Sequence, residues 1–207
     1  LTLLNTLTWI LSYNLKKLFP IFLDNIDERD GRLHFVLSNI PSCKGKKILD
    51  LGCAKGRYIN KLQEAKLPCS LYAQDLHDIF IPFMPSGLTT SCGSILRTGW
   101  TDGYFDGIFI CEVLEHAIDV QMALQELNRI LAIGGTLIIV DKNDSKLASW
   151  PGKLPEWEQW FNINKLNILL EEIGFSVEKI DQNVHYENGK NDNLFFGIVA
   201  IKIENCN

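Results

Sequence analysis

The sequence predicts an α/β fold in which helices cover a mostly parallel, seven-stranded sheet. Two observations predict it. Short apolar runs alternate with amphipathic helical segments between residues 46 and 141, and two further strand-like runs close the chain with no helix between them. Alternating strands and helices form parallel sheets, whereas strands joined by a short loop pair antiparallel. We therefore expect the strands 176–181 and 194–203 to pair antiparallel at the edge of the sheet, and 194–203 to be the antiparallel strand of a mostly parallel sheet.

The individual elements follow from the spacing of apolar residues. Residues 1–40 read as two helical stretches, the second over 30–40 and stopped by Pro41. The expected strands after it are 46–51, 70–75, 88–93, 104–111, 136–140, 176–181 and 194–203, and the expected helices are 57–66, 120–131 and 165–173. Gly134 and Gly135 are expected to cap the helix 120–131, and Gly174 to end the last helix. Residues 185–193 are polar and are expected to form a loop.

Composition limits the classes of protein to consider. The 207 residues suit one domain over 1–207, with an N-terminal helical lid (1–40), a ligand-binding core (46–141) and a C-terminal segment with a hairpin (142–207). Apolar residues make up 46% and charged residues 22%, as in ordinary globular proteins. The net charge of −5 gives no electrostatic footprint for duplex nucleic acid.

Neither a membrane anchor nor a disulfide framework is expected. Polar and charged residues interrupt the apolar stretch 1–23, so it suits neither a membrane span nor a signal peptide. The six cysteines are scattered without a Cys-x-x-Cys spacing: Cys43, Cys53, Cys69, Cys92, Cys111 and Cys206. We interpret them as free thiols in a reducing compartment, which favours a cytoplasmic protein.

The strongest local signal is a glycine-containing loop between the first strand and the following helix. Its sequence is Asp50-Leu51-Gly52-Cys53-Ala54-Lys55-Gly56. Ligands of open α/β sheets bind beyond the carboxyl ends of the strands. The two glycines let the backbone approach a ligand, and the N-terminus of the next helix attracts a carboxylate. Asp75 ends the second strand, where an acidic side chain can accept both hydroxyls of a ribose. A solvated Asp at a strand end is the simpler alternative.

Four ordered motifs resemble the class I S-adenosylmethionine-dependent methyltransferases. They are the segment 48–56, Asp75, the segment 104–116 (Tyr-Phe-Asp-Gly-Ile-Phe-Ile-Cys-Glu-Val-Leu-Glu-His), and the segment 127–137 with Gly134-Gly135. The resemblance implies a Rossmann-like three-layer sandwich, and S-adenosylmethionine as the methyl donor, with S-adenosylhomocysteine as product. The cofactor-binding residues that it implies are Asp50, Gly52, Cys53, Ala54, Gly56, Asp75, Leu76, Ser94, Ile95, Cys111 and Glu112.

Two of these positions depart from the family pattern. Ala54 stands where the family has the middle glycine of the loop, and we expect cofactor binding to survive the extra methyl group. Ser94 stands where the family often has an Asp that contacts the adenine amino group. A hydroxyl can still accept a hydrogen bond there, although more weakly than a carboxylate.

His116 is the candidate catalytic base, because it follows the fourth strand and its pKa range suits proton transfer. The simpler alternative is a histidine that starts the next helix and packs locally. Glu112, Glu115 and His116 also resemble the Glu-x-x-Glu-His segments that bind a divalent metal in some small-RNA and ubiquinone-pathway O-methyltransferases. Related enzymes without metal share these residues, and Mg²⁺ wants more oxygen ligands than the sequence offers. We therefore assign no metal ligand.

Aromatic residues outside the core segment could contact the acceptor. Trp150, Trp157 and Trp160 follow the fifth strand, where the resembling family lines its acceptor pocket, although they could equally roof the core. Tyr13 on the first helix could close over the cofactor, or simply pack.

The expected reaction is methyl transfer to an oxygen or nitrogen atom of a small-molecule acceptor. The alternatives left open are a peptide or protein methyltransferase, an RNA methyltransferase, and a non-catalytic S-adenosylmethionine-binding module. Fold resemblance does not choose among them, because function depends on the site.

Overall fold

The computed structural model describes residues 26–41, 44–149, 156–186 and 190–204. One seven-stranded sheet has the order β3-β2-β1-β4-β5-β7-β6. β7 runs antiparallel to both of its neighbours, β5 and β6, and the other strand pairs are parallel. The strands are β1 (Lys47–Leu51), β2 (Ser70–Asp75), β3 (Thr89–Cys92), β4 (Phe105–Cys111), β5 (Leu131–Lys142), β6 (Phe175–Tyr186) and β7 (Lys190–Lys202). The predicted mostly parallel sheet with an antiparallel C-terminal strand is confirmed.

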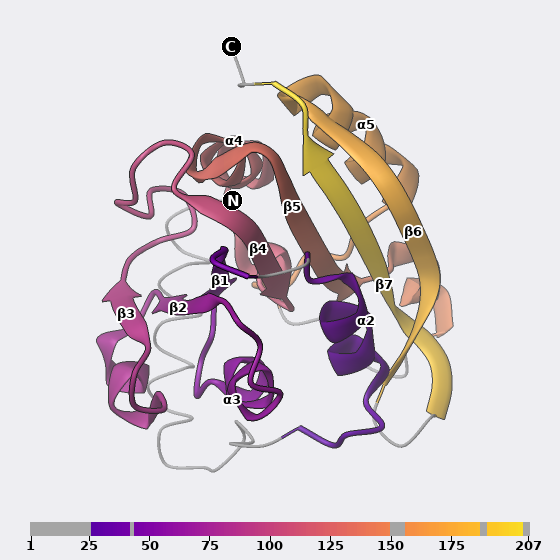
Figure 1. Ribbon diagram of the computed structural model, residues 1–207. Helices are drawn as coiled ribbons and strands as arrows, with labels where there is room; N and C mark the ends of the chain where they lie inside the picture. Colours follow the sequence, from indigo (N-terminus) through magenta and orange to yellow (C-terminus); the bar gives the residue numbers. More distant parts are fainter. Residues whose placement is uncertain (1–25, 42–43, 150–155, 187–189, 205–207) are drawn as a thin grey trace.

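Helices cover both faces of this sheet, as Figure 1 shows. They are α2 (Gly31–Asn39), α3 (Arg57–Glu64), α4 (Val120–Ile130) and α5 (Ile163–Ile173), together with the short 3₁₀ helices η2 (Asp78–Phe83), η3 (Leu114–His116) and η4 (Asp144–Ser149). Apolar side chains of α4 and α5 pack in one buried cluster with one face of the sheet, and those of α2 and α3 pack in a second cluster on the other. The architecture is therefore the predicted three-layer sandwich. No helix of the described ranges is long and apolar enough to cross a membrane.

The C-terminus of α4 differs from the prediction. The helix ends at Ile130, and Gly134 and Gly135 lie inside β5 and do not cap the helix. The carbonyls at this end are bound by Lys202, whose Nζ donates to the oxygens of Asn128 at 2.7 Å and Leu131 at 2.8 Å. A buried ammonium group from the last strand thus replaces the expected left-handed glycine cap. Gly174, with φ +102°, does end α5 as predicted.

The last two strands are longer than their apolar patterns suggested. β6 reaches Tyr186 and β7 begins at Lys190, so both extend into the polar segment that was expected to be a loop. Backbone hydrogen bonds between antiparallel strands tolerate polar side chains at a sheet edge, which explains the difference. The predictions for residues 1–25, including Tyr13, and for Trp150 lie outside the described residues.

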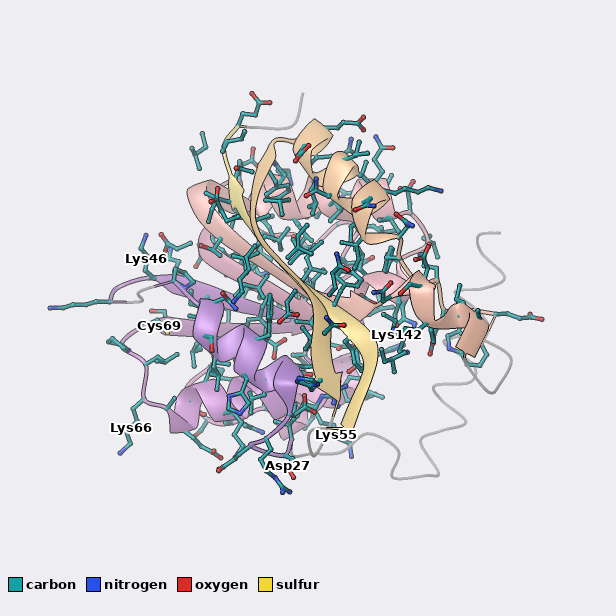
Figure 2. The ribbon with its side chains drawn as sticks, turned by 90° about the vertical axis from the view of Figure 1, so that its right-hand side faces the viewer. Asp27, Lys46, Lys55, Lys66, Cys69 and Lys142 are labelled. Carbon is teal, nitrogen blue, oxygen red and sulfur yellow. The ribbon has the colours of Figure 1, made fainter. Side chains whose placement is uncertain are left out.

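The strand order places a topological switch point at the middle of the sheet, between β1 and β4. From β1 the chain continues outward to β2 and β3 on one side, and β4 and β5 lie on the other. Ligands bind at such a switch point, beyond the carboxyl ends of the strands. In Figure 2, Lys46 and Cys69, which precede β1 and β2, lie at the left, and Lys142, which ends β5, lies at the right.

Candidate cofactor and acceptor site

The loop after β1 is held close to the end of β4. Gly52 has φ +83°, and a Cβ added to it would lie 2.3 Å from Cγ2 of Val113, so only glycine allows this approach. Gly56, with φ +79°, is the N-cap of α3. Ala54 also takes a left-handed conformation, with φ +45°. The position where the family has glycine therefore needs a glycine-like backbone here too, and the alanine side chain strains it.

Asp75 is tied directly to this loop. Its Oδ2 accepts a hydrogen bond from the Ala54 N–H at 2.8 Å, and its Oδ1 accepts one from the His77 N–H at 3.1 Å. The side chain is 7% exposed. Burial raises the pKa of Asp75, and the N–H groups of His77 and Ala54 partly oppose that shift. The structure thus brings together the loop and the acid that the sequence analysis paired.

Asp50 lies beneath the same loop. It is buried and accepts a hydrogen bond from the backbone of Ile59 in the first turn of α3. Burial, with Asp75 nearby, raises its pKa well above the ordinary value. Its Oδ2 has no hydrogen-bond partner among the described residues. Asp50 therefore fixes the start of α3 against the end of β1 and leaves one polar atom for a ligand or water.

The other predicted cofactor residues lie on the loops that follow β1, β2 and β3 and at the last residue of β4. Cys53 and Cys111 are buried, and Leu76 is 39% exposed beside Asp75. The Gly93 N–H donates to the Asp75 carbonyl, which sets Ser94 and Ile95 next to the end of β2. The Ser94 hydroxyl accepts a hydrogen bond from the Leu96 N–H at 3.1 Å.

Glu112 belongs to an ionic group that we call the cofactor-side cluster: Asp30, Arg32, Arg57 and Glu112. Arg32 and Arg57 both donate to Oε1 of Glu112, at 2.5 and 2.7 Å. Arg32 also donates from Nε and Nη2 to the two carboxylate oxygens of Asp30, at 3.0 and 2.6 Å. Asp30 and Arg32 are almost completely buried. Burial would raise the pKa of Glu112, but Arg32 and Arg57 hold it below its ordinary value.

Glu112 also has an unusual backbone. Its φ is +58°, a left-handed value that costs a non-glycine residue free energy. Such strain persists where surrounding contacts fix the residue, and it is concentrated at functional sites. Here the two arginines fix the side chain directly after β4. The sequence analysis predicted Glu112 but missed Asp30, Arg32 and Arg57.

A second ionic group, the acceptor-side cluster, begins three residues later. It contains Glu115, His116, Asp141, Lys142 and Glu158. His116 Nε2 lies 3.2 Å from Glu115 Oε1, and Lys142 Nζ lies 2.9 Å from both Glu115 Oε1 and Glu158 Oε2. Glu115 is 2% exposed, and the side chain of His116 is 25% exposed. The predicted base is thus paired with a buried carboxylate.

Asp141 supports this cluster from β5. Its Oδ2 accepts a hydrogen bond from the Glu115 N–H at 3.2 Å, and its Oδ1 accepts one from the Lys142 N–H at 2.8 Å. Burial, and next the charge of Glu115, raise the pKa of Asp141 well above its ordinary value. Two adjacent buried carboxyl groups favour keeping one proton between them. The sequence analysis missed Asp141, Lys142 and Glu158.

The segment 156–161 brings Glu158 over η3. The Gln159 N–H donates to the Glu115 carbonyl at 3.1 Å, and Gln159 Nε2 donates to the Ala117 carbonyl at 2.5 Å. Of the three tryptophans considered for the acceptor pocket, Trp157 and Trp160 are described, and both are half-buried. Trp160 packs against the core cluster on the α2–α3 face, so part of its surface serves the core.

Comparisons with known proteins agree with this geometry. Residues 49–139 match a family model described as a methyltransferase domain. The chain is 28% identical over 180 residues to the bovine (Bos taurus) mitochondrial ubiquinone biosynthesis O-methyltransferase, covering 73% of this chain and 48% of that protein. It is 23% identical over 189 residues to a tRNA U34 carboxymethyltransferase of Idiomarina loihiensis, covering 80% and 57%. The chain thus spans about half the length of these relatives.

The comparison with solved structures concerns the fold. An S-adenosylmethionine-dependent methyltransferase from Mesorhizobium loti superposes with a TM-score of 0.70 at 15% identity, covering 84% of this chain and 99% of that one. That likeness establishes the fold, while the matched sequence segment 49–139 contains the β1 loop, Asp75 and the end of β4. Together these findings show that residues 49–139 resemble a methyltransferase domain and that the chain has the fold of solved S-adenosylmethionine-dependent methyltransferases.

Proposed function

We propose that this enzyme transfers the methyl group of S-adenosylmethionine to an oxygen or nitrogen atom of a small-molecule acceptor, with His116 as the base. The observation that carries the proposal is the His116–Glu115 pair, 3.2 Å apart at the end of β4, next to the residues assigned to the cofactor. A carboxylate beside an imidazole can hold the ring in one orientation, and a fixed orientation is what proton removal by a base requires.

The residues around the loop fit the chemistry of the cofactor. Asp75 offers carboxylate oxygens to ribose hydroxyls, and the start of α3, with Arg57, offers N–H groups and positive charge to the methionine carboxylate. Glu112 offers a negative charge to the methionine amino group. The sulfonium of the bound cofactor supplies an already activated methyl group, so positioning of the acceptor can provide much of the rate.

The proposal assigns each acceptor-side residue one task. His116 would take the acceptor's proton at Nδ1, because Nε2 faces Glu115, as the acceptor attacks the methyl carbon and the methyl–sulfur bond breaks to release S-adenosylhomocysteine. Glu115 Oε1 holds His116 Nε2 and stabilises the resulting imidazolium. Trp157, half-buried in the segment that crosses η3, would help to exclude water from the acceptor.

An RNA acceptor is the second candidate, supported by the relative whose name specifies tRNA U34. The net charge of −5 favours the small molecule. The choice can be tested by incubating the enzyme with methyl-labelled S-adenosylmethionine, a small-molecule extract and purified tRNA. We expect label in the solvent-extractable fraction. Label confined to acid-precipitable RNA would refute the small-molecule assignment.

The role of His116 requires its own variant. With an acceptor identified, His116→Ala should lower turnover about 10²–10⁴-fold, because general-base catalysis contributes on this order. The affinity for S-adenosylhomocysteine should barely change. His34→Ala, on the exposed surface of α2, is the matched control and should keep full turnover. Near-normal turnover of His116→Ala would reduce this histidine to a packing residue.

A further inference from the structure

The acceptor-side cluster contains a geometry that could hold a metal ion. Glu115, His116 and Glu158 each bring one potential ligand atom within 4.8 Å of the others. Glu115 is 2% exposed, and its Oε2 has no hydrogen-bond partner within the described ranges. Two carboxylates and an imidazole are ligands that divalent cations accept.

Lys142 already supplies the positive charge of this cluster. Its Nζ lies 2.9 Å from Glu115 Oε1 and 2.9 Å from Glu158 Oε2, so it bridges the two carboxylates that a metal would need. The Lys142 side chain is only 13% exposed, and the two carboxylate side chains are 2% and 16% exposed. These are short, charge-assisted hydrogen bonds in a largely desolvated place.

Charge and geometry both oppose a second cation in the same position. A divalent ion bound to Glu115 and Glu158 would lie within a few ångströms of the ammonium group, and the repulsion between them would be weakly screened by the buried surroundings. Hard cations also need about six or more ligands. Glu112, which completes the metal-binding sequence pattern, is bound by Arg32 and Arg57 instead.

We propose that Lys142 replaces a divalent metal in this enzyme: its ammonium group is a positioning group that holds Glu115 and Glu158 together and thereby orients His116. The part of the proposal that concerns methyl transfer rests on the proposed function. The exclusion of metal from the cluster does not, because it follows from the Lys142 contacts alone.

Manganese binding tests the exclusion without any acceptor. The free Mn²⁺ signal in electron paramagnetic resonance is followed while chelator-treated protein is titrated. Wild-type protein should show no saturable site up to about 1 mM Mn²⁺, the range of weak protein sites for such hard cations. Lys142→Met removes the charge but keeps most of the side-chain length, and should bind Mn²⁺ at least about tenfold more tightly. Lys142→Arg keeps the charge and should behave like the wild type.

The outcomes separate clearly. A saturable Mn²⁺ site in the wild type that disappears in Glu115→Gln would overturn the proposal, as would identical Mn²⁺ titrations of the wild type and a folded Lys142→Met protein. Folding of each variant is checked by its thermal transition and by S-adenosylhomocysteine binding. If Lys142→Met does not fold, Lys142→Gln takes its place.

The response of turnover to chelator and to Mn²⁺ distinguishes a positioning lysine from a lysine that only stabilises the fold. With an acceptor identified, chelator should leave wild-type turnover unchanged. Lys142→Met should lose about tenfold or more in turnover, and added Mn²⁺ should restore part of it, because the ion would then occupy the vacated position between the carboxylates. Chelator-sensitive wild-type turnover, or a Lys142→Met variant with full turnover, would contradict it. If His116→Ala is fully active while Lys142→Met gains a Mn²⁺ site, the base assignment fails and the exclusion of metal stands.

Discussion

The two ionic clusters at the end of β4 are three residues apart in sequence but differ in how they balance charge. In the cofactor-side cluster two arginines form ion pairs with two carboxylates, Asp30 and Glu112. In the acceptor-side cluster three carboxyl groups surround one lysine, together with His116. Among the described residues, the first cluster therefore has equal numbers of arginines and carboxyl groups, while the second has more carboxyl groups than lysines, and one of them, Asp141, has a raised pKa.

The difference matches the tasks that we propose for the two clusters. A balanced cluster with fixed side chains can keep a constant shape for a charged cofactor. A cluster in which a buried carboxyl group has a raised pKa, close to a histidine, suits a place where protons move. The opposite pKa shifts of the carboxyl groups, lowered for Glu112 and raised for Asp141, express this contrast.

The largest expected effect on stability comes from breaking the balanced cluster. Arg32→Met would leave the buried Asp30 and part of Glu112 without their counter-charge, and should lower the free energy of unfolding by about 3–5 kcal/mol. Arg29→Met is the matched control, because Arg29 makes the same two-residue pairing with Asp27 but its side chain is 72% exposed. Chemical denaturation of both variants measures the difference. Equal losses would show that burial does not strengthen this pairing.

Stability against pH should separate the two clusters. Because the folded pKa of Glu112 lies below its ordinary 4.5, the stability that it contributes is present above pH 4.5 and is lost as the pH falls through the folded value. Glu112→Gln should therefore lower stability at pH 7 by about 1–3 kcal/mol, with the loss shrinking in acid. A Glu112→Gln deficit that is constant from pH 7 to pH 3 would contradict this linkage.

Asp141 should show the opposite sign. Its folded pKa lies above the ordinary 3.8, so its contribution is fully present below pH 3.8 and declines as the pH rises toward the folded value. Asp141→Asn removes this ionisation, but it keeps only one of the two oxygens that accept from the Glu115 and Lys142 N–H groups, so a loss that is independent of pH is expected as well. Relative to the wild type, the variant should therefore gain about 1–3 kcal/mol as the pH rises from acid to pH 8. Denaturation curves across the same pH range test it, and a stability difference between the two proteins that does not change with pH would be the contrary result.

The smallest expected effect concerns the strained loop. Ala54→Gly should relieve the left-handed backbone at φ +45°, worth about 1–2 kcal/mol. The greater freedom of glycine in the unfolded chain offsets about 0.4–1 kcal/mol of this gain. Thermal unfolding should therefore show a gain of about 0–1.6 kcal/mol. Ala123→Gly, inside the buried face of α4, should instead lose about 1 kcal/mol or more. A destabilised Ala54→Gly protein would mean that the methyl group makes a favourable contact.

The sequence predicted most of the fold because apolar spacing is a local signal. The strand 70–75 was predicted with the bounds that the structure gives, and the helix 120–131 was one residue too long. The cap of that helix could not be predicted, because it depends on Lys202, more than 70 residues further along the chain. The length of β6 and β7 depends on backbone pairing between them, which a polar sequence does not reveal.

The same reasoning explains the gaps in the predicted site. The β1 loop and Asp75 could be predicted because both stand at the ends of strands. In the structure they are in contact, since the Ala54 N–H donates a hydrogen bond to Asp75. Arg32 is 80 residues from Glu112, and an ion pair at that distance leaves no local pattern. Asp141 and Lys142 could have been noticed, since they are charged residues directly after the buried strand residues 137–140.

Titration of the purified protein with S-adenosylhomocysteine in a calorimeter tests the central claim most directly. The claim is that the β1 loop and Asp75 form a cofactor site. We expect saturable binding by the wild type, and binding weakened by about 1–3 kcal/mol in Asp75→Ala, because ribose hydroxyls lose a charged acceptor. Absence of heat, together with an unchanged melting temperature at millimolar ligand, would contradict the account.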